Sequence, residues 1–562
     1  MVRCSAVWHA PPMRPSLRRP SIVPLATAVG LAGAILGPLA TPAAVAAAEP
    51  NFPSNMSGYH NLPEMVAEIQ QAEANYPGLV DVFSIGTSYQ GRDIWAAKIS
   101  DNVGTDEAEP EVLIDALHHA REHLTVEQAL ATLRWLTRDY ASNATVRRLV
   151  NGREIFIIFA LNPDGMRYDL TGDPFRAWRK NRQPNPGSTA VGTDLNRNYG
   201  YKFGCCGGSS GNPANIQYRG AAAFSAPETR ALRDFVKSRV VNGVQQIRAH
   251  ITLHTNGELI LWPYGYTYRN VPPDMTSLDH KTFVALGRAQ AAKNGYTAQQ
   301  SSDLYITDGD QIDWLYATYR IFTFTYELYP TETPTVWGDH YPDDSKIAAQ
   351  TARNRGAILH LINRAACPYA ALGADATRAD CGPLFDDLEI NRGWTRNADG
   401  TDTATSGLWA VANPAATSSN GAKQLTTAYS GSKALVTGGG AGTSATSNDV
   451  DGGTTTMRSR PVKLPSSASS YGPLTFRFYL AHGSNATSAD SLRVLVEAEN
   501  GTRTVVFEEL AAANDDDAAW AFASRSVAAW AGQTIRLVVE ATDGAGESLV
   551  EAAIDDIRIR RP

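Results

Sequence analysis

The sequence predicts two domains of different fold class. The first is an α/β domain, a three-layer αβα sandwich around a mixed sheet, and the second is an all-β jelly-roll sandwich. Three observations support this division. The chain has 562 residues, which is too long for one hydrophobic core. Strand-like and helix-like segments alternate over residues 50–381, whereas short strands separated by Gly, Ser, Thr, Asn and Asp fill residues 383–562.

The first fifty residues have the features of an export signal. Arg18 and Arg19 precede an apolar run over residues 22–39, and small residues at 46–48 offer an A-x-A cleavage site. A membrane anchor is the alternative, but the run is short for a bilayer and contains two prolines. We therefore expect residues 1–48 to be a secretion signal and the protein to be extracellular.

Composition and charge exclude other classes of protein. The net charge is −7, and no basic stripe supplies the phosphate-neutralising contacts that a nucleic-acid partner needs. No segment after the signal is apolar enough to span a membrane. We expect a monomer.

The elements of the first domain follow from local patterns. Residues 79–100 are typical of two strands joined through a turn at 90–93. The segment SAPETRALRDFVKSRV predicts a helix that opens with a capping box of Ser225 and Glu228 and an early Pro227. Further helices are predicted over 124–136 and 345–366, and short apolar runs predict buried strands at 111–117, 154–160, 248–255, 258–265 and 320–328.

Four cysteines remain once Cys4 has left with the signal, and they can oxidise outside the cell. Cys367 and Cys381 are placed to close a loop at the end of the first domain. Cys205 and Cys206 are adjacent, so that either a vicinal disulfide or two free thiols is compatible with the sequence.

The stretch DALHHAREHLTVE concentrates three histidines and two glutamates in thirteen residues. One interpretation takes His119, Glu122 and His123 as the H-x-x-E-H pattern of inverted zinc proteases, which requires a helix there. The strand predicted up to Leu117 favours a second interpretation, in which only His119 and Glu122 of this stretch are ligands. The third ligand is then His254, at the end of a distant strand, and water takes the fourth position.

The resemblance to a known family carries this second interpretation. The segments HHAREH, NPDG, WRKNR, GTDLNRNYG, LHT, LYITDGDQIDW and FTYELYP occur in the order and approximate spacing of zinc carboxypeptidases, above all the bacterial carboxypeptidase T group and its actinomycete relatives. The resemblance covers about residues 50–381. It implies one catalytic zinc ion held by His119, Glu122 and His254, with His118 and His123 as neighbours.

The same resemblance implies roles for further residues. Glu327 is the general base for zinc-activated water, and Arg179 polarises the scissile carbonyl. Asn196 and Arg197 bind the free carboxylate of a peptide or protein C-terminus, Tyr305 closes over it, and Arg121 contacts the peptide further along. The alternative is a zinc amidase or endopeptidase acting on peptidoglycan peptide cross-links, which the carboxylate-binding pair disfavours.

The resemblance also implies a side-chain pocket with broad specificity. Ile312 stands where relatives strict for Lys and Arg carry an acid, so hydrophobic C-terminal residues are expected, while Asp310 allows Lys or Arg. Asn256 replaces the aromatic residue that the family usually has two positions after its last zinc ligand. The pocket is expected near Leu261, Gly265, Thr307, Asp310, Ile312 and Thr325.

Acidic clusters suggest calcium, because hard carboxylate oxygens suit that ion. The resemblance to carboxypeptidase T points to Asp106, Glu107, Glu111 and Glu154, and to Ser57, Tyr59 and Glu64 near the amino end.

The second domain resembles jelly-roll modules of secreted bacterial hydrolases, and by analogy it binds a polymer or a cell surface. There, Asp386, Glu389, Asp449, Asp451 and Asp556 are candidates for one shared calcium ion, and Trp394, Trp409 and Trp520 either bind a polymer or, as we favour, fill the core.

Overall fold

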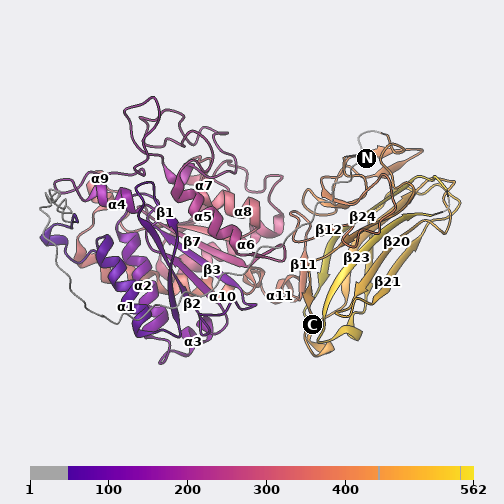
Figure 1. Ribbon diagram of the computed structural model, residues 1–562, viewed down its shortest axis with the longest axis horizontal. Helices are drawn as coiled ribbons and strands as arrows, with labels where there is room; N and C mark the ends of the chain where they lie inside the picture. The colour runs from indigo at the N-terminus through magenta and orange to yellow at the C-terminus, as the bar shows by residue number, and fades with distance from the viewer. Residues whose placement is uncertain (1–48, 441–443, 545) are drawn as a thin grey trace, which may run out of the picture. The chain divides into compact units, whose positions relative to one another are not determined.

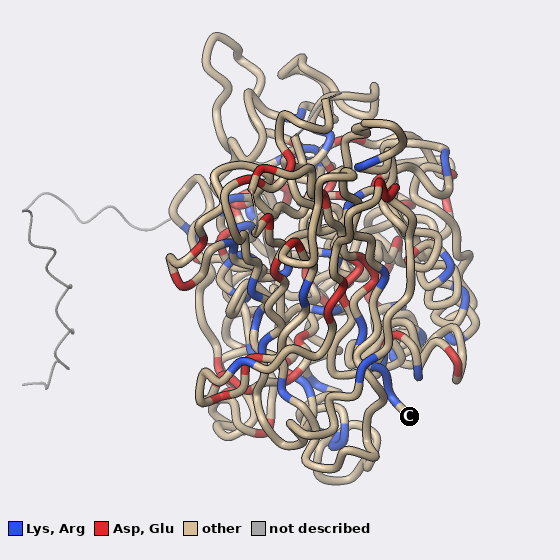
Figure 2. Tube along the Cα trace, turned by 90° about the vertical axis from the view of Figure 1, so that its right-hand side faces the viewer, with Lys and Arg blue, Asp and Glu red and all other residues tan. Residues whose placement is uncertain are grey.

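The computed structural model describes residues 49–440, 444–544 and 546–562. The predicted secretion signal, residues 1–48, lies outside the described part. No described helix has both the length and the apolar character needed to cross a membrane. Basic and acidic residues are interspersed along the trace of the described residues (Figure 2).

A mixed eight-stranded sheet forms the centre of the first domain (Figure 1). Its middle is parallel, since β4, β3, β7 and β10 run in one direction, while β1, β2 and β8 join by antiparallel pairing. The strands in sheet order are β1 (Val80–Thr87), β2 (Asp93–Ile99), β4 (Glu154–Ile158), β3 (Glu111–Ala116), β7 (Ile247–Thr255), β10 (Phe322–Leu328), β8 (Leu259–Trp262) and β9 (Thr297–Gln300).

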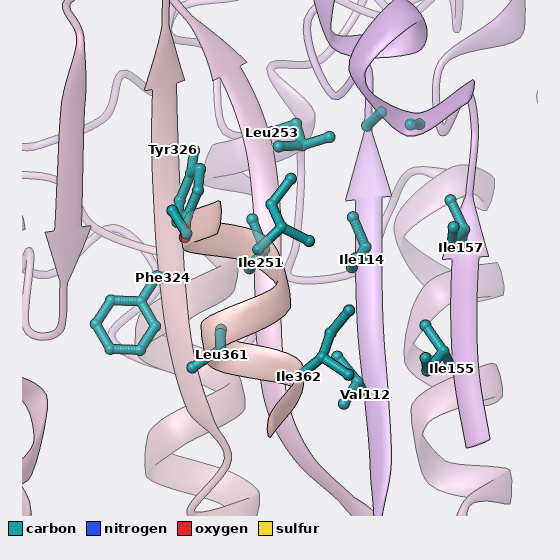
Figure 3. Packing of buried hydrophobic residues seen from close by; sticks show 14 of the residues in the cluster. Val112, Ile114, Ile155, Ile157, Ile251, Leu253, Phe324, Tyr326, Leu361 and Ile362 are labelled. Atoms are coloured by element: carbon teal, nitrogen blue, oxygen red, sulfur yellow. The ribbon is translucent and has the colours of Figure 1, made fainter. Parts of the chain in front are cut away.

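Helices cover both faces of this sheet, which gives the predicted three layers. One core joins the sheet to α1 (Leu62–Asn75), α2 (Leu124–Arg138), α6 (Ser277–Asn294) and α10 (Ile347–Arg364), and a second core on the other face joins it to α5 (Pro227–Ser238) and α8 (Gln311–Tyr319). Figure 3 shows Val112, Ile114, Ile155, Ile157, Ile251 and Leu253 of the parallel strands packed with Leu361 and Ile362 of α10. The shorter helices are α3 (Ala144–Val150), α4 (Pro163–Asp169), α7 (Ser301–Leu304), α9 (Val336–His340) and α11 (Ala374–Asp380), and β5 (Val240–Val241) pairs with β6 (Val244–Gln245).

The predicted capping box of α5 is wrong, although the helix is present. Its N-cap is Ala226, and no side chain caps it. Ser225 instead accepts a hydrogen bond from Asn198, and Glu228 accepts from the Tyr89 amide and from Asn181. Long-range partners have therefore taken the two side chains that a local pattern assigns to the helix start.

Two six-stranded antiparallel sheets form the second region and share one core, which includes Trp394 and Trp409. Those two tryptophans fill the core as favoured, and Trp520 is half-buried. Within the described part, no three of the proposed acidic residues here form a group of closely spaced donor atoms, and the shared calcium site stays a prediction. The first of the two sheets holds β13 (Ala410–Ala412), β16 (Ala434–Val436), β24 (Val550–Ile559), β19 (Leu474–His482), β22 (Ala521–Arg525) and β11 (Leu384–Asp386). The second sheet holds β12 (Thr395–Arg396), β17 (Gly453–Arg458), β23 (Thr534–Asp543), β20 (Ser491–Glu497), β21 (Arg503–Leu510) and β18 (Val462–Lys463). In addition, β14 (Thr417–Ser418) pairs with β15 (Ala422–Gln424).

Both possible disulfides are formed. Cys367 is joined to Cys381, and the adjacent Cys205 and Cys206 are joined to each other, which decides the question that the sequence left open.

The packing of the first core predicts a stability effect. Ile251 is fully buried, so Ile251→Ala should lower the free energy of unfolding by about 2–5 kcal/mol, because lost burial and the cavity left behind both contribute. The matched Ile251→Val variant should lose only about 0.5–1.5 kcal/mol. Calorimetric unfolding of both variants measures this, and equal midpoints would contradict close packing at this position.

Candidate metal centre and substrate cavity

Three buried side chains bring donor atoms together at the carboxyl ends of β3 and β7. Glu122 Oε1 lies 2.7 Å from His119 Nδ1, Glu122 Oε2 lies 3.0 Å from His254 Nδ1, and the two Nδ1 atoms are 3.2 Å apart. His119 and Glu122 stand in the short connection between β3 and α2. Leu117, with a φ of 60°, turns the chain there as the strand ends.

The protonation of this group suits a zinc ion. His119 Nε2 lies 3.1 Å from Asp194 Oδ1. Although burial opposes ionisation, Arg179 and His119 hold the pKa of Asp194 well below its usual value, so that the carboxylate accepts the Nε2 proton and leaves Nδ1 free. Burial lowers the pKa of His254 to about 4, which keeps that ring neutral. Two imidazoles and one carboxylate are a donor set of catalytic zinc sites.

The other two histidines of the HHAREH segment face different partners. His118 Nε2 lies 2.8 Å from the Tyr199 hydroxyl, and His123 Nε2 lies 2.9 Å from Asp169 Oδ2. His123 is the N-cap of α2, where the helix has only begun. The geometry therefore does not follow the H-x-x-E-H interpretation, which places both histidines within one helix.

Glu327 reaches the same region from a third parallel strand, β10, where it pairs in register with His254 of β7. Its side chain lines a cavity that His119 and Glu122 also line. The loss of hydration inside the protein, and then the charge of Glu122, raise the pKa of Glu327 well above its ordinary value. A carboxyl with a raised pKa is suited to accept a proton and return it.

Arg179 is tied to the metal group through Asp194. Its Nε atom donates to Asp194 Oδ2 at 3.0 Å, while Asp194 Oδ1 also accepts from the Asn196 amide at 3.0 Å. Arg121 lines the cavity beside Arg179 and has a buried Nε atom without a partner. One carboxylate thus orients His119, Arg179 and the start of the turn that carries Asn196.

Arg197 is almost fully buried, with only 1% of its surface exposed, and it lines the cavity. Its Nε donates to the Gly208 carbonyl at 2.9 Å and one terminal nitrogen donates to the Asn196 carbonyl at 2.6 Å. The second terminal nitrogen has no partner. The exposed Tyr305 ring lies 5.9 Å from the guanidinium carbon. A buried donor without a partner is costly, so an anion in the cavity would satisfy it.

One cavity of about 620 Å³ collects the predicted residues. Its floor includes Asp310, the N-cap of α8, which accepts hydrogen bonds from Thr307 and from the Asp313 amide. A side-chain carbon at Gly265 would lie 2.0 Å from Thr307 Oγ1, so glycine is needed there. The predicted residues that line it are His119, Arg121, Glu122, Arg179, Asn196, Arg197, Leu261, Tyr305, Thr307, Asp310, Ile312, Thr325 and Glu327.

Sequence reasoning missed two parts of this site. Asp194 lies in the GTDLNRN motif, two residues before Asn196, and that position was its only signal. The segment that follows β10 also lines the cavity, through Glu332, Val336, Asp339 and His340. No local pattern identified these four residues.

The proposed calcium ligands divide between two groups. Asp106, Glu111 and Glu154 lie together, whereas Glu107 is grouped with Asp101 and Glu109. The first group already contacts cations: Arg239 bonds to Glu111 and Asp106, and Lys98 Nζ lies 2.7 Å from Glu154. Near the amino end, Glu64 completes the capping box of α1 with Asn61.

Comparison with known proteins agrees with this geometry. A family model described as "Zinc carboxypeptidase" matches residues 65–354, just over half of the chain. A zinc carboxypeptidase of Saccharothrix mutabilis subsp. capreolus is 49% identical over 323 residues, which are 58% of this chain and 73% of that protein. Mouse carboxypeptidase A2 is 35% identical over 282 residues, 49% of this chain, and the match spans 64% of that protein.

Among solved structures, thrombin activatable fibrinolysis inhibitor is 26% identical, with a TM-score of 0.49, and the match covers 56% of this chain and 76% of that one. The family model and the Saccharothrix relative together decide the assignment. The chain belongs to the zinc carboxypeptidase family of hydrolases.

Proposed function

We propose that the protein is a C-terminal exopeptidase that removes single residues from peptides and proteins. The observation that carries the proposal is the unpaired terminal nitrogen of Arg197, a residue that lines the same cavity as His119 and Glu122. Although burial opposes the charged form, Asp194, Tyr305 and Asp310 hold the pKa of Arg197 above its ordinary value. A permanent cation there selects substrates that end in a free carboxylate.

The residues then divide the reaction between them. A zinc ion held by His119, Glu122 and His254 would supply Lewis acidity and make hydroxide available near neutral pH. Glu327 accepts a proton from the attacking water and returns it to the leaving nitrogen. Arg179, held by Asp194, donates to the carbonyl oxygen as negative charge develops there. Arg197 and Asn196 hold the terminal carboxylate and so fix which bond is presented.

The floor of the cavity supports broad specificity. Ile312, Leu261 and Thr325 are nearly fully buried around it and suit a hydrophobic terminal side chain. Asp310 places one carboxylate at the same floor, where a Lys or Arg side chain would pair with it.

The proposal also includes secretion, a calcium site and a binding role for the second region. The pattern of residues 1–48 and the two disulfides support secretion. Calcium at Asp106, Glu111 and Glu154 would join a group that Arg239 and Lys98 already neutralise in part. The jelly-roll class of the second region, and its binding to a polymer or cell surface, are kept as proposals by analogy.

The exopeptidase proposal predicts a clear difference between matched peptides. Free-acid peptides ending in Phe, Leu, Arg or Glu should lose single residues stepwise, whereas the C-terminally amidated forms should not, because Arg197 then meets no anion. Mass spectrometry of the digests, with and without a zinc chelator, measures this. Equal cleavage of both forms would contradict the assignment and favour an amidase or endopeptidase.

Replacing the proposed general base should separate chemistry from metal binding. Glu327→Gln should lower kcat by roughly 10²- to 10⁴-fold, the usual contribution of a positioned proton-transfer group. The zinc content of the purified variant should stay that of the wild type. Glu332→Gln, which changes an exposed acid of the same cavity, is the matched control. Similar losses in both variants would argue against a special role for Glu327.

The side-chain pocket predicts a selective variant. Asp310→Asn should lower kcat/KM for peptides ending in Lys or Arg by roughly 10- to 100-fold, since one charge-assisted contact is lost, and leave peptides ending in Phe unchanged. Asparagine can still cap α8, so the pocket should keep its shape. Equal losses on Phe and Arg ends would contradict the role.

The same residue predicts a dependence on pH. Burial, with a contribution from Asp308, raises the pKa of Asp310, while Thr307, the Asp313 amide and Arg197 oppose the rise. A carboxyl with a raised pKa is charged only above that pKa. The ratio of activity on Arg ends to activity on Phe ends should therefore fall as the pH drops through it, and this change should be absent in Asp310→Asn.

A further inference from the structure

A short turn over residues 205–209 supplies the contact that orients the buried Arg197. The Gly208 carbonyl in this turn accepts from Arg197 Nε at 2.9 Å. The other bonded nitrogen of the guanidinium donates to the Asn196 carbonyl, the residue directly before it. The 205–209 turn is therefore the distant restraint that decides which way the unpaired nitrogen points.

The 205–209 turn contains no helix or strand, and the Asp308 side chain bonds to three of its residues. The Asp308 carboxylate accepts from the Cys206 amide at 3.0 Å, from the Gly208 amide at 2.9 Å and from the Ser209 hydroxyl. Asp308 is only 1% exposed. A buried carboxylate with three donors from one turn fixes that turn, because each donor would lose a charge-assisted hydrogen bond if the turn moved.

Asp308 also belongs to the segment that carries the substrate-binding Tyr305 and Asp310, although it does not itself line the cavity. The turn and this segment are in close contact, since a side-chain carbon at Gly208 would lie 2.4 Å from the Thr307 backbone. Gly309, which directly follows Asp308, has a φ of 65°, and a side-chain carbon there would lie 2.6 Å from the Arg197 carbonyl. Asp308 thus joins the segment of the side-chain pocket to the turn that orients the carboxylate anchor.

We propose that Asp308 is the positioning residue of the carboxylate anchor: it holds the 205–209 turn so that Gly208 keeps the unpaired nitrogen of Arg197 directed at the cavity. The inference rests on the proposed exopeptidase function and goes beyond it. Asp308 touches no substrate, and it acts on the free carboxylate through Gly208 and Arg197. Its loss therefore changes the binding of C-terminal carboxylates more than the chemical step.

Asp308→Ala tests this in the full-length zinc enzyme. KM for free-acid peptides should rise roughly 10- to 100-fold, the value of one charge-assisted contact, while kcat changes much less. The inhibition constant of N-acetyl-phenylalanine should rise by the same factor. That of N-acetyl-phenylalanine amide, which lacks the carboxylate, should not change. A general loss of structure would affect both inhibitors.

Two further variants separate positioning from stability. Asp308→Asn keeps an amide oxygen for the Cys206 and Gly208 donors, and its KM for free-acid peptides should stay close to that of the wild type. Asp490→Ala is the matched control, because Asp490 is equally buried and also accepts from two backbone amides, those of Thr487 and Gly544, and one serine hydroxyl, that of Ser548. It should lower stability without changing KM.

The outcomes are distinguishable. An unchanged KM in Asp308→Ala, or the same rise in Asp490→Ala, overturns the role of Asp308. If wild-type enzyme shows no preference for free acids over amides, the exopeptidase proposal itself fails. Should Asp308→Ala not fold, Ser209→Ala removes one of the three hydrogen bonds, and a smaller rise in KM limited to free acids supports the role, whereas no rise overturns it.

Discussion

The carboxylate of Asp194 is the interaction on which the site depends. One oxygen accepts from His119 and from the Asn196 amide, and the other accepts from Arg179. The carboxylate therefore fixes which nitrogen of His119 is free and the direction of the Arg179 side chain beside it. Because it is fully buried, those partners must stay in place to compensate its lost hydration. The positions of His119, Arg179 and the turn that carries Asn196 are thereby coupled through one carboxylate.

The central sheet positions the other residues of the site around the Asp194 carboxylate. The parallel strands β3, β7 and β10 end at the same edge, where β7, β10 and the loop that follows β3 line the cavity. In-register pairing sets Glu327 beside His254, although the two are far apart in the chain. Ligand sites commonly form beyond the carboxyl ends of strands in such sheets, because side chains from several strands and their loops converge there.

Buried charge is distributed unevenly between structural and functional uses. Around Asp106, Glu111 and Glu154 the carboxylates have cationic partners in Arg239 and Lys98. In the cavity, by contrast, Arg197 keeps one donor nitrogen without a partner. An unsatisfied buried donor lowers stability, and a site that retains one gains affinity for the group that completes it.

The sequence by itself determined the alternation of strands and helices in the first domain, the strand-rich second region and the family. Period and turn residues act locally, and motifs such as GTDLNRN keep their spacing. Only the tertiary structure decided that Ser225 and Glu228 bond far from their helix and that Asp194 and Asp308 orient Arg179 and Arg197. It also brought the 332–340 segment to the cavity wall. The physical reason is that register and burial choose the partners of each buried polar group, and neither is encoded in a local pattern.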